Sequence, residues 1–127
     1  MTTQEFTARR EAEVTAPMLE YYRSWSAEGE GSYTEKHIQK CADLLDAYAA
    51  EIAAIDAPVG AGRDKKIMSA VKKVVLALNK LNEKTDYEML ETDERESICT
   101  LIHDAAVGAG LSVIPEDDDV TGEWREF

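Results

Sequence analysis

Two pairs of residues with metal-binding side chains occur at equal spacing in this sequence. His37 precedes Cys41 by four positions in HIQKC, and Cys99 precedes His103 by four positions in CTLIH. Residues four apart lie on one face of a helix, so each pair could present two ligands together. Two Cys and two His form a common tetrahedral ligand set for zinc. On two antiparallel helices, the opposite order of the pairs would place like residues at matching heights.

The same pairs also have a structural interpretation, which we favour. Cys41 falls on the apolar stripe of its helix, where a buried free cysteine is common. Structural zinc sites usually take one ligand pair from a tight knuckle rather than both pairs from helices. A chain of 127 residues can bury a core without metal. We therefore expect no cofactor, and zinc bound by His37, Cys41, Cys99 and His103 remains the alternative.

Signatures of catalysis are missing from the sequence. It contains no G-x-S-x-G motif, and the glycine-rich stretch GAGRDKK at residues 60–66 lacks the G-x-x-x-x-G-K-[ST] pattern of a phosphate-binding loop. The pair His103–Asp104 is typical of metal-dependent phosphohydrolases, but two histidines cannot supply the remaining ligands. We predict that the protein is not an enzyme.

The elements that would position these residues are helices, because apolar residues recur at steps of three and four along most of the chain. The first stripe covers residues 6–25, and Pro17 either kinks one helix there or begins a second one. Ser32 with Glu35 matches a capping box and predicts a helix running to about Asp56. Another helix is predicted from Asp64.

The last helix is predicted to start at Thr92 or Asp93, with Glu96 completing a second capping signature, and to end at Gly108. The two central helices, joined by a short Pro/Gly turn, indicate an antiparallel hairpin. We expect an all-α, single-domain bundle of four to five helices over residues 1–127. It would contain a long antiparallel helical hairpin and end in an acidic C-terminal turn.

Aromatic residues cluster at two places. One group lies at the end of the first apolar stripe and consists of Tyr21, Tyr22 and Trp25. These residues would either pack in the core or anchor a partner. Trp124 and Phe127 are three positions apart, and we expect them to fold the C-terminal tail back onto the bundle.

The net charge of −12 is concentrated in the last third of the chain. Residues 1–85 carry 13 acidic and 12 basic side chains, a net of −1, whereas residues 86–127 carry 13 acidic side chains against only Arg95 and Arg125, a net of −11. Such a surface repels phosphates, so we expect no direct contact with nucleic acid. A basic protein is the natural partner.

The compartment is predicted from what the sequence lacks. It has no apolar run near the ~20 residues of a membrane span, no signal-peptide core, and only two cysteines. We expect a cytoplasmic protein that does not bind membranes.

Residues 78–127 resemble a pattern in small acidic bacterial proteins, some of which are immunity partners of polymorphic toxins. The matching stretches are LNKLNEKTD, ETDERESICTLIHDAAVGAGL and DVTGEWREF. This resemblance implies a protein that binds a cognate toxin, and it assigns no functional residues.

Charge and resemblance together predict an immunity-type protein that neutralises a basic toxin by covering its active or substrate surface. An acidic regulator or nucleic-acid mimic is the alternative. In either case the predicted contact residues lie in the C-terminal turn: Glu116, Asp117, Asp118, Asp119, Glu123 and Trp124. The three aspartates have no basic neighbour before Arg125, so we expect them to be exposed and mutually repelling.

Overall fold

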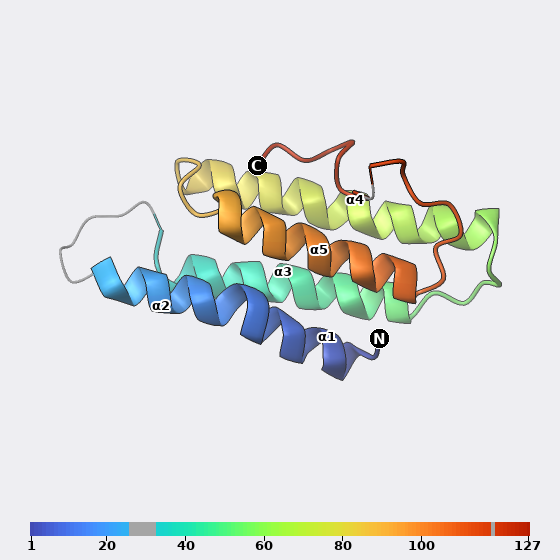
Figure 1. Ribbon diagram of the computed structural model, residues 1–127, viewed down its shortest axis with the longest axis horizontal. Helices are drawn as coiled ribbons and strands as arrows, with labels where there is room; N and C mark the ends of the chain where they lie inside the picture. The colour runs from blue at the N-terminus through green and yellow to red at the C-terminus, as the bar shows by residue number, and fades with distance from the viewer. Residues whose placement is uncertain (26–32, 118) are drawn as a thin grey trace.

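The computed structural model describes residues 1–25, 33–117 and 119–127, and all regular structure in these ranges is helical. The first rod is built from α1 (Thr3–Arg10), the π-helical turn η1 (Glu11–Thr15) and α2 (Ala16–Trp25). It is followed by α3 (Glu35–Ala53), α4 (Ala61–Lys84) and α5 (Thr92–Gly108). The prediction of an all-α protein is confirmed, with four rods in the described part of the chain (Figure 1).

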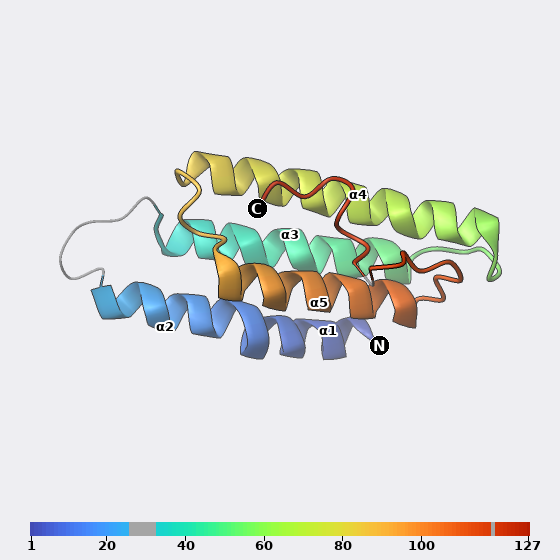
Figure 2. The same cartoon turned by 45° about the horizontal axis from the view of Figure 1, so that its top comes forward.

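The four rods lie side by side and alternate in direction (Figures 1 and 2). Consequently α3 and α5 run the same way and meet across the centre of the bundle, where the Tyr48 hydroxyl donates to the Ile102 carbonyl at 2.8 Å. Their C-terminal ends therefore lie close together. Arg63 serves both ends, donating to the carbonyls of Ile55 and Ala57 beyond α3 and of Ala109 beyond α5. A cation at this place also complements the negative ends of both helix dipoles.

One continuous core fills the space between the rods. The apolar stripes predicted for the three later helices are buried almost throughout, including Leu45, Ile67, Leu78 and Leu101 at 0% exposure. Full burial of such side chains contributes about 1.5–3 kcal/mol each. Tyr21 is an exception in the first stripe, because 58% of its surface is exposed.

Pro17 neither breaks the first rod nor leaves it regular. The Ala16 N–H bonds to the Glu11 carbonyl, five residues back, as in a π turn. Proline lacks an N–H, and its ring crowds the preceding turn of an α-helix. The wider π turn relieves that crowding, so α2 continues without a loop. Arg10 donates to Thr15 within this turn and to both carboxylate oxygens of Asp46 on α3, at 2.9 and 3.0 Å.

Three helix starts differ from the sequence prediction, and one of them is that of α4, which begins at Ala61 and not at Asp64. Ser32 lies outside the described residues, and α3 takes Thr34 as its N-cap, with the Thr34 N–H donating to His37 Nδ1 at 3.0 Å. The N-cap of α5 is Glu91, and its side chain makes no capping bond, so the predicted box with Glu96 does not form. At α3 the capping box is made by Thr34 and His37, and at α5 no capping side chain marks the start.

The connection between α4 and α5 is held by a buried side chain. Two successive residues, Asp86 and Tyr87, have φ values of 54° and 61°, which turn the chain sharply. Asn82 spans this turn, since its backbone carbonyl accepts the Tyr87 N–H at 2.8 Å and its side-chain oxygen accepts the Leu90 N–H at 3.0 Å. The turn thereby sets where α5 starts.

Among the described residues, no helix is long and apolar enough to cross a membrane.

We predict that Asn82→Ala lowers the free energy of unfolding by about 1–3 kcal/mol, because the buried Leu90 N–H loses its acceptor. Lys80→Ala, an exposed change on the same helix, is the control and should shift stability by less than about 0.5 kcal/mol. Urea denaturation followed by circular dichroism measures both. Equal stabilities of the two variants would contradict the role given to Asn82.

Candidate functional site

The C-terminal segment, residues 111–127, leaves α5 and crosses back over α4 (Figures 1 and 2). Leu111 and Val120 are buried, and Trp124 and Phe127 pack half-buried against the core. The prediction that these two aromatic residues fold the tail onto the bundle is confirmed. The segment carries the acidic side chains on which the predicted binding surface depends.

Asp64 and Asn79, both on α4, tie down the two ends of this segment. At its start, both oxygens of the Asp64 carboxylate accept from Ser112, one from the N–H at 2.9 Å and one from the hydroxyl, and these bonds lower the pKa of Asp64. At its end, the Asn79 side chain donates to the Trp124 carbonyl at 2.8 Å and accepts the Glu126 N–H at 2.9 Å. Asn79 is only 9% exposed, so its amide pairs with backbone much as a neighbouring strand would.

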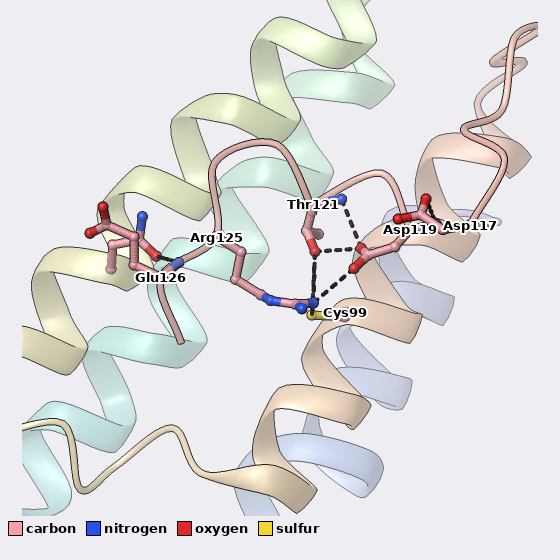
Figure 3. A network of polar contacts seen from close by, with 7 residues as sticks. Cys99, Asp117, Asp119, Thr121, Arg125 and Glu126 are labelled. Atoms are coloured by element: carbon pink, nitrogen blue, oxygen red, sulfur yellow. Dashed lines mark hydrogen bonds and ion pairs between the residues drawn. The ribbon is translucent and has the colours of Figure 1, made fainter.

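Arg125 makes the third attachment, which joins the C-terminal end of the segment to its middle and to α5 (Figure 3). Its guanidinium donates to Asp119 at 2.8 Å and to the Cys99 sulfur on α5 at 3.1 Å. Thr121, which is fully buried, donates its N–H and its hydroxyl to the same Asp119 carboxylate, and its hydroxyl also contacts the Cys99 sulfur at 3.4 Å. Three residues of the segment are thus bound to one another and to α5.

Asp119 is therefore not the free, repelling carboxylate that the sequence predicted. Partial burial alone would raise its pKa, but the bonds from Thr121 and the charge of Arg125 outweigh burial, and the pKa lies below its ordinary value. The expectation overlooked that Arg125, six positions further on, returns to Asp119 because residues 120–124 form a tight turn. That part of the prediction was wrong.

The remaining predicted contact residues divide into two groups. Glu116, Asp117 and Glu123 are exposed, whereas Trp124 is half-buried and helps to dock the segment. Asp118 lies outside the described residues. The Asp117 carboxylate accepts the Asp119 N–H at 3.2 Å, which links an exposed acid to the bound one. The exposed carboxylates consequently sit on a backbone with a defined position.

The structure does not bring the four His and Cys residues together. Helices α3 and α5 are parallel, not antiparallel, so the opposite order of the pairs does not place like residues side by side. His37 contributes to the cap of α3, and Cys41 is 0% exposed, with burial raising its pKa to about 12 although Arg10 acts in the opposite direction. In the described part of the chain, no three His, Cys, Asp or Glu residues gather as a metal site.

Cys99 and His103 do share a small cavity of about 260 Å³ on the outer face of α5, which Asp119 and Arg125 also line. The His103 Nδ1 atom is buried and makes no hydrogen bond. With Arg125 already committed to Asp119, the cavity offers a thiol and an imidazole at its wall but no pair bonded to each other. The arrangement serves the docking of the C-terminal segment.

Sequence reasoning missed Asn79, Thr121 and Cys99 as residues that hold the acidic segment. Asn79 had a visible signal, because it follows Leu78 on the buried side of α4, where a polar side chain must find partners. Thr121 and Cys99 had none, since their contact joins positions that are 22 residues apart.

We predict that Asp119→Asn lowers the free energy of unfolding at neutral pH by about 1.5 kcal/mol, because it weakens charge-assisted bonds from Arg125 and Thr121. A lowered folded-state pKa gives stability that is present above the unfolded value of about 4 and is lost as pH falls through the folded value. The difference from wild type should therefore shrink when urea denaturation is repeated from pH 6 down to pH 2.

Asp117→Asn is the matched control for this comparison, since its exposed side chain can still accept the Asp119 N–H. It should change stability by less than about 0.5 kcal/mol. If both variants behave alike, or if the Asp119→Asn difference is independent of pH, the network does not fix the segment.

We also predict that iodoacetamide alkylates one thiol of the native protein, that of Cys99. Cys99 is partly exposed and lines an open cavity, whereas Cys41 is fully buried. Mass spectrometry of peptides locates the adduct, and Cys41 should react only in denaturant. Cys99→Ser should make the native protein unreactive, and alkylation of native Cys41 would show that α3 is packed differently.

Comparison of the chain with protein-family models, with curated proteins and with solved structures found no match.

Proposed function

We propose that this is a cytoplasmic, non-catalytic binding protein that neutralises a basic protein by covering its active or substrate surface, in the manner of a toxin immunity protein. Support comes from the distribution of charge in space. Nine exposed carboxylates lie on the α4–α5 turn, on α5 and on the C-terminal segment: Asp86, Glu88, Glu91, Asp93, Glu96, Glu116, Asp117, Glu123 and Glu126.

The observation that carries the proposal is that the acidic segment is held in place. Residues 111–127 contain a single cation, and Arg125 points inward to Asp119 and Cys99. The carboxylates of Glu116, Asp117 and Glu123 are therefore left facing solvent on a fixed backbone. A preorganised surface loses less conformational entropy on binding than a free tail would.

Opposite charge on the exposed side chains of α4 would orient the approach of a partner. Six lysines on α4 are exposed: Lys65, Lys66, Lys72, Lys73, Lys80 and Lys84. A basic protein is repelled by this helix and attracted to α5 and the C-terminal segment, which favours one docking geometry. The resemblance of residues 78–127 to immunity-type proteins supports the same class of partner.

The natural first partner to test is the product of the gene adjacent to the one that encodes this protein. We expect that product to inhibit growth when expressed alone, to be tolerated when both are expressed, and to form a complex with this protein. A nucleic-acid mimic would behave differently, since it would bind unrelated basic proteins such as histones and lysozyme with similar affinity. Absence of any complex with the adjacent product would remove the immunity proposal.

The contribution of the fixed acids is tested by two matched triple variants. Glu116→Gln/Asp117→Asn/Glu123→Gln removes three charges from the segment, and Glu20→Gln/Asp56→Asn/Glu83→Gln removes three exposed charges elsewhere. The first should slow association about tenfold at low salt, with a smaller effect at high salt, and leave dissociation nearly unchanged. The second should stay within about twofold of wild type. Equal slowing by both variants, measured by stopped-flow or biolayer interferometry, would show that only net charge matters.

A further inference from the structure

The first rod and the C-terminal segment lie on opposite sides of α5 (Figure 2). A second acidic feature lies on the side of the first rod. It is a groove of about 320 Å³ between the first rod and the first turn of α5, which we call the α2–α5 groove. This volume is at the lower end of the range for ligand sites, so the groove suits one or two side chains better than a whole small molecule. Its lining includes Val14, Pro17, Met18, Tyr21, Glu91 and Glu94.

The groove combines an apolar floor with an acidic rim. Val14 and Met18 are 1% and 2% exposed and form part of the continuous core beneath it. Tyr21 also lines the groove, and 58% of its surface is exposed. Surfaces that bind other proteins commonly have a solvent-exposed aromatic ring next to buried apolar side chains.

The acids at the rim have no cation among the lining residues. Glu13 is paired with Arg9, which also bonds to Asp104, but Glu91, Asp93 and Glu94 make no ion pair with any residue that the structure describes. Burial, together with the charges of Glu91 and Asp93, raises the pKa of Glu94. Asp93 and Glu94 do complement the positive end of the α5 dipole. Glu91 has the same role, because it is the N-cap of α5. That role does not account for the exposed ring of Tyr21.

We propose that the α2–α5 groove receives an arginine side chain of the basic partner. Its aliphatic stem would lie on Pro17 and Met18, and its guanidinium would meet the carboxylates of Glu91 and Glu94 beneath the Tyr21 ring. A guanidinium is planar, bonds carboxylates in pairs and stacks on aromatic rings, so it uses all of these features, whereas a phosphate group would be repelled.

This inference rests on the proposed function, because it assigns one anchoring contact to the same partner. The groove and the C-terminal segment flank α5 on its two sides, so a partner lying along α5 can reach both. The exposed carboxylates of the segment would attract the partner from a distance. The groove would then hold one of its side chains in a desolvated site, where central anchors contribute most to affinity.

The test uses two short peptides, acetyl-Gly-Arg-Gly-amide and its citrulline twin, which has the same shape without the charge. Carbon-detected NMR of the labelled protein follows the Met18 methyl group and the Tyr21 ring during titration. The arginine peptide should give saturable shifts at both groups, and the citrulline peptide should give none. Shifts that spread over all acidic surfaces without saturation, or no shifts at these two groups, would overturn the proposal.

Variants separate the groove from the segment. Glu91→Gln/Glu94→Gln should weaken peptide binding at least tenfold, and Tyr21→Ala several-fold, while Glu116→Gln/Asp117→Asn/Glu123→Gln should leave it unchanged. Thermal melts check that each variant folds. If the complex with the adjacent gene's product forms but is insensitive to Glu91→Gln/Glu94→Gln, the groove is not an anchor although the proposed function stands. If the peptide binds in the groove but no complex forms, the proposed function fails and the arginine site remains.

Discussion

The acidic surface of this protein depends on what happens to one guanidinium. Arg125 is the single cation of residues 111–127, and it is bound between Asp119 and the Cys99 sulfur of α5. A charge-assisted bond of this kind, less than a third exposed on both sides, is among the stronger polar contacts that a protein makes. Because the cation is used internally, the segment is attached to the bundle, and no described basic side chain of the segment is left to pair with the exposed carboxylates of Glu116, Asp117, Glu123 and Glu126. The Arg125 interaction therefore contributes to both the order and the charge of the surface, beside the attachments made by Asp64 and Asn79.

The helical bundle also has one end where a cation is bound by protein groups and another where acidic side chains have no cation beside them in the groove. Alternation of the rods makes α3 and α5 parallel, so their like ends meet at each end of the molecule. At the C-terminal ends of α3 and α5, Arg63 donates to backbone carbonyls of the residues that follow each helix. Near the N-terminal end of α5, burial raises the pKa of Tyr33 to about 12, and Glu94, Tyr21, Glu91 and Glu88 act in the same direction. The negative potential there comes from acids that no lining cation of the groove neutralises.

Local sequence patterns were enough to predict the helices but not how they pair with distant residues. The stripe from Ile67 to Leu81 predicts α4 because its apolar period matches one helical face, and all its members are buried. The same reasoning left Tyr21 either in the core or on a contact surface, since periodicity cannot show that Met18 is buried while the ring of Tyr21 is exposed. The antiparallel arrangement that would match the His and Cys pairs is not found, for a related reason. Whether two helices are parallel depends on how many helices lie between them along the chain, and two short motifs do not carry that information.

The docked segment shows the same limit at the candidate site. Trp124 and Phe127 indicated that the tail returns to the bundle, because two large apolar side chains so close together need a buried face. The partners that hold it, Asn79 and Cys99, lie 45 and 26 residues away from their contacts and follow from tertiary geometry alone. The sequence predicts a free Asp119 because Arg125 is six positions away along the chain, although the two side chains are in contact in space.

Amide hydrogen exchange of the free protein tests most directly whether the acidic surface is preformed. The Glu126 N–H bonds to buried Asn79 and the Thr121 N–H bonds to Asp119, so both should exchange far more slowly than in an unstructured chain. Asn79→Ala should release the Glu126 N–H and leave that of Thr121 protected. Exchange of both amides at the unstructured rate in the wild-type protein would contradict the account, because the acids would then belong to a free tail.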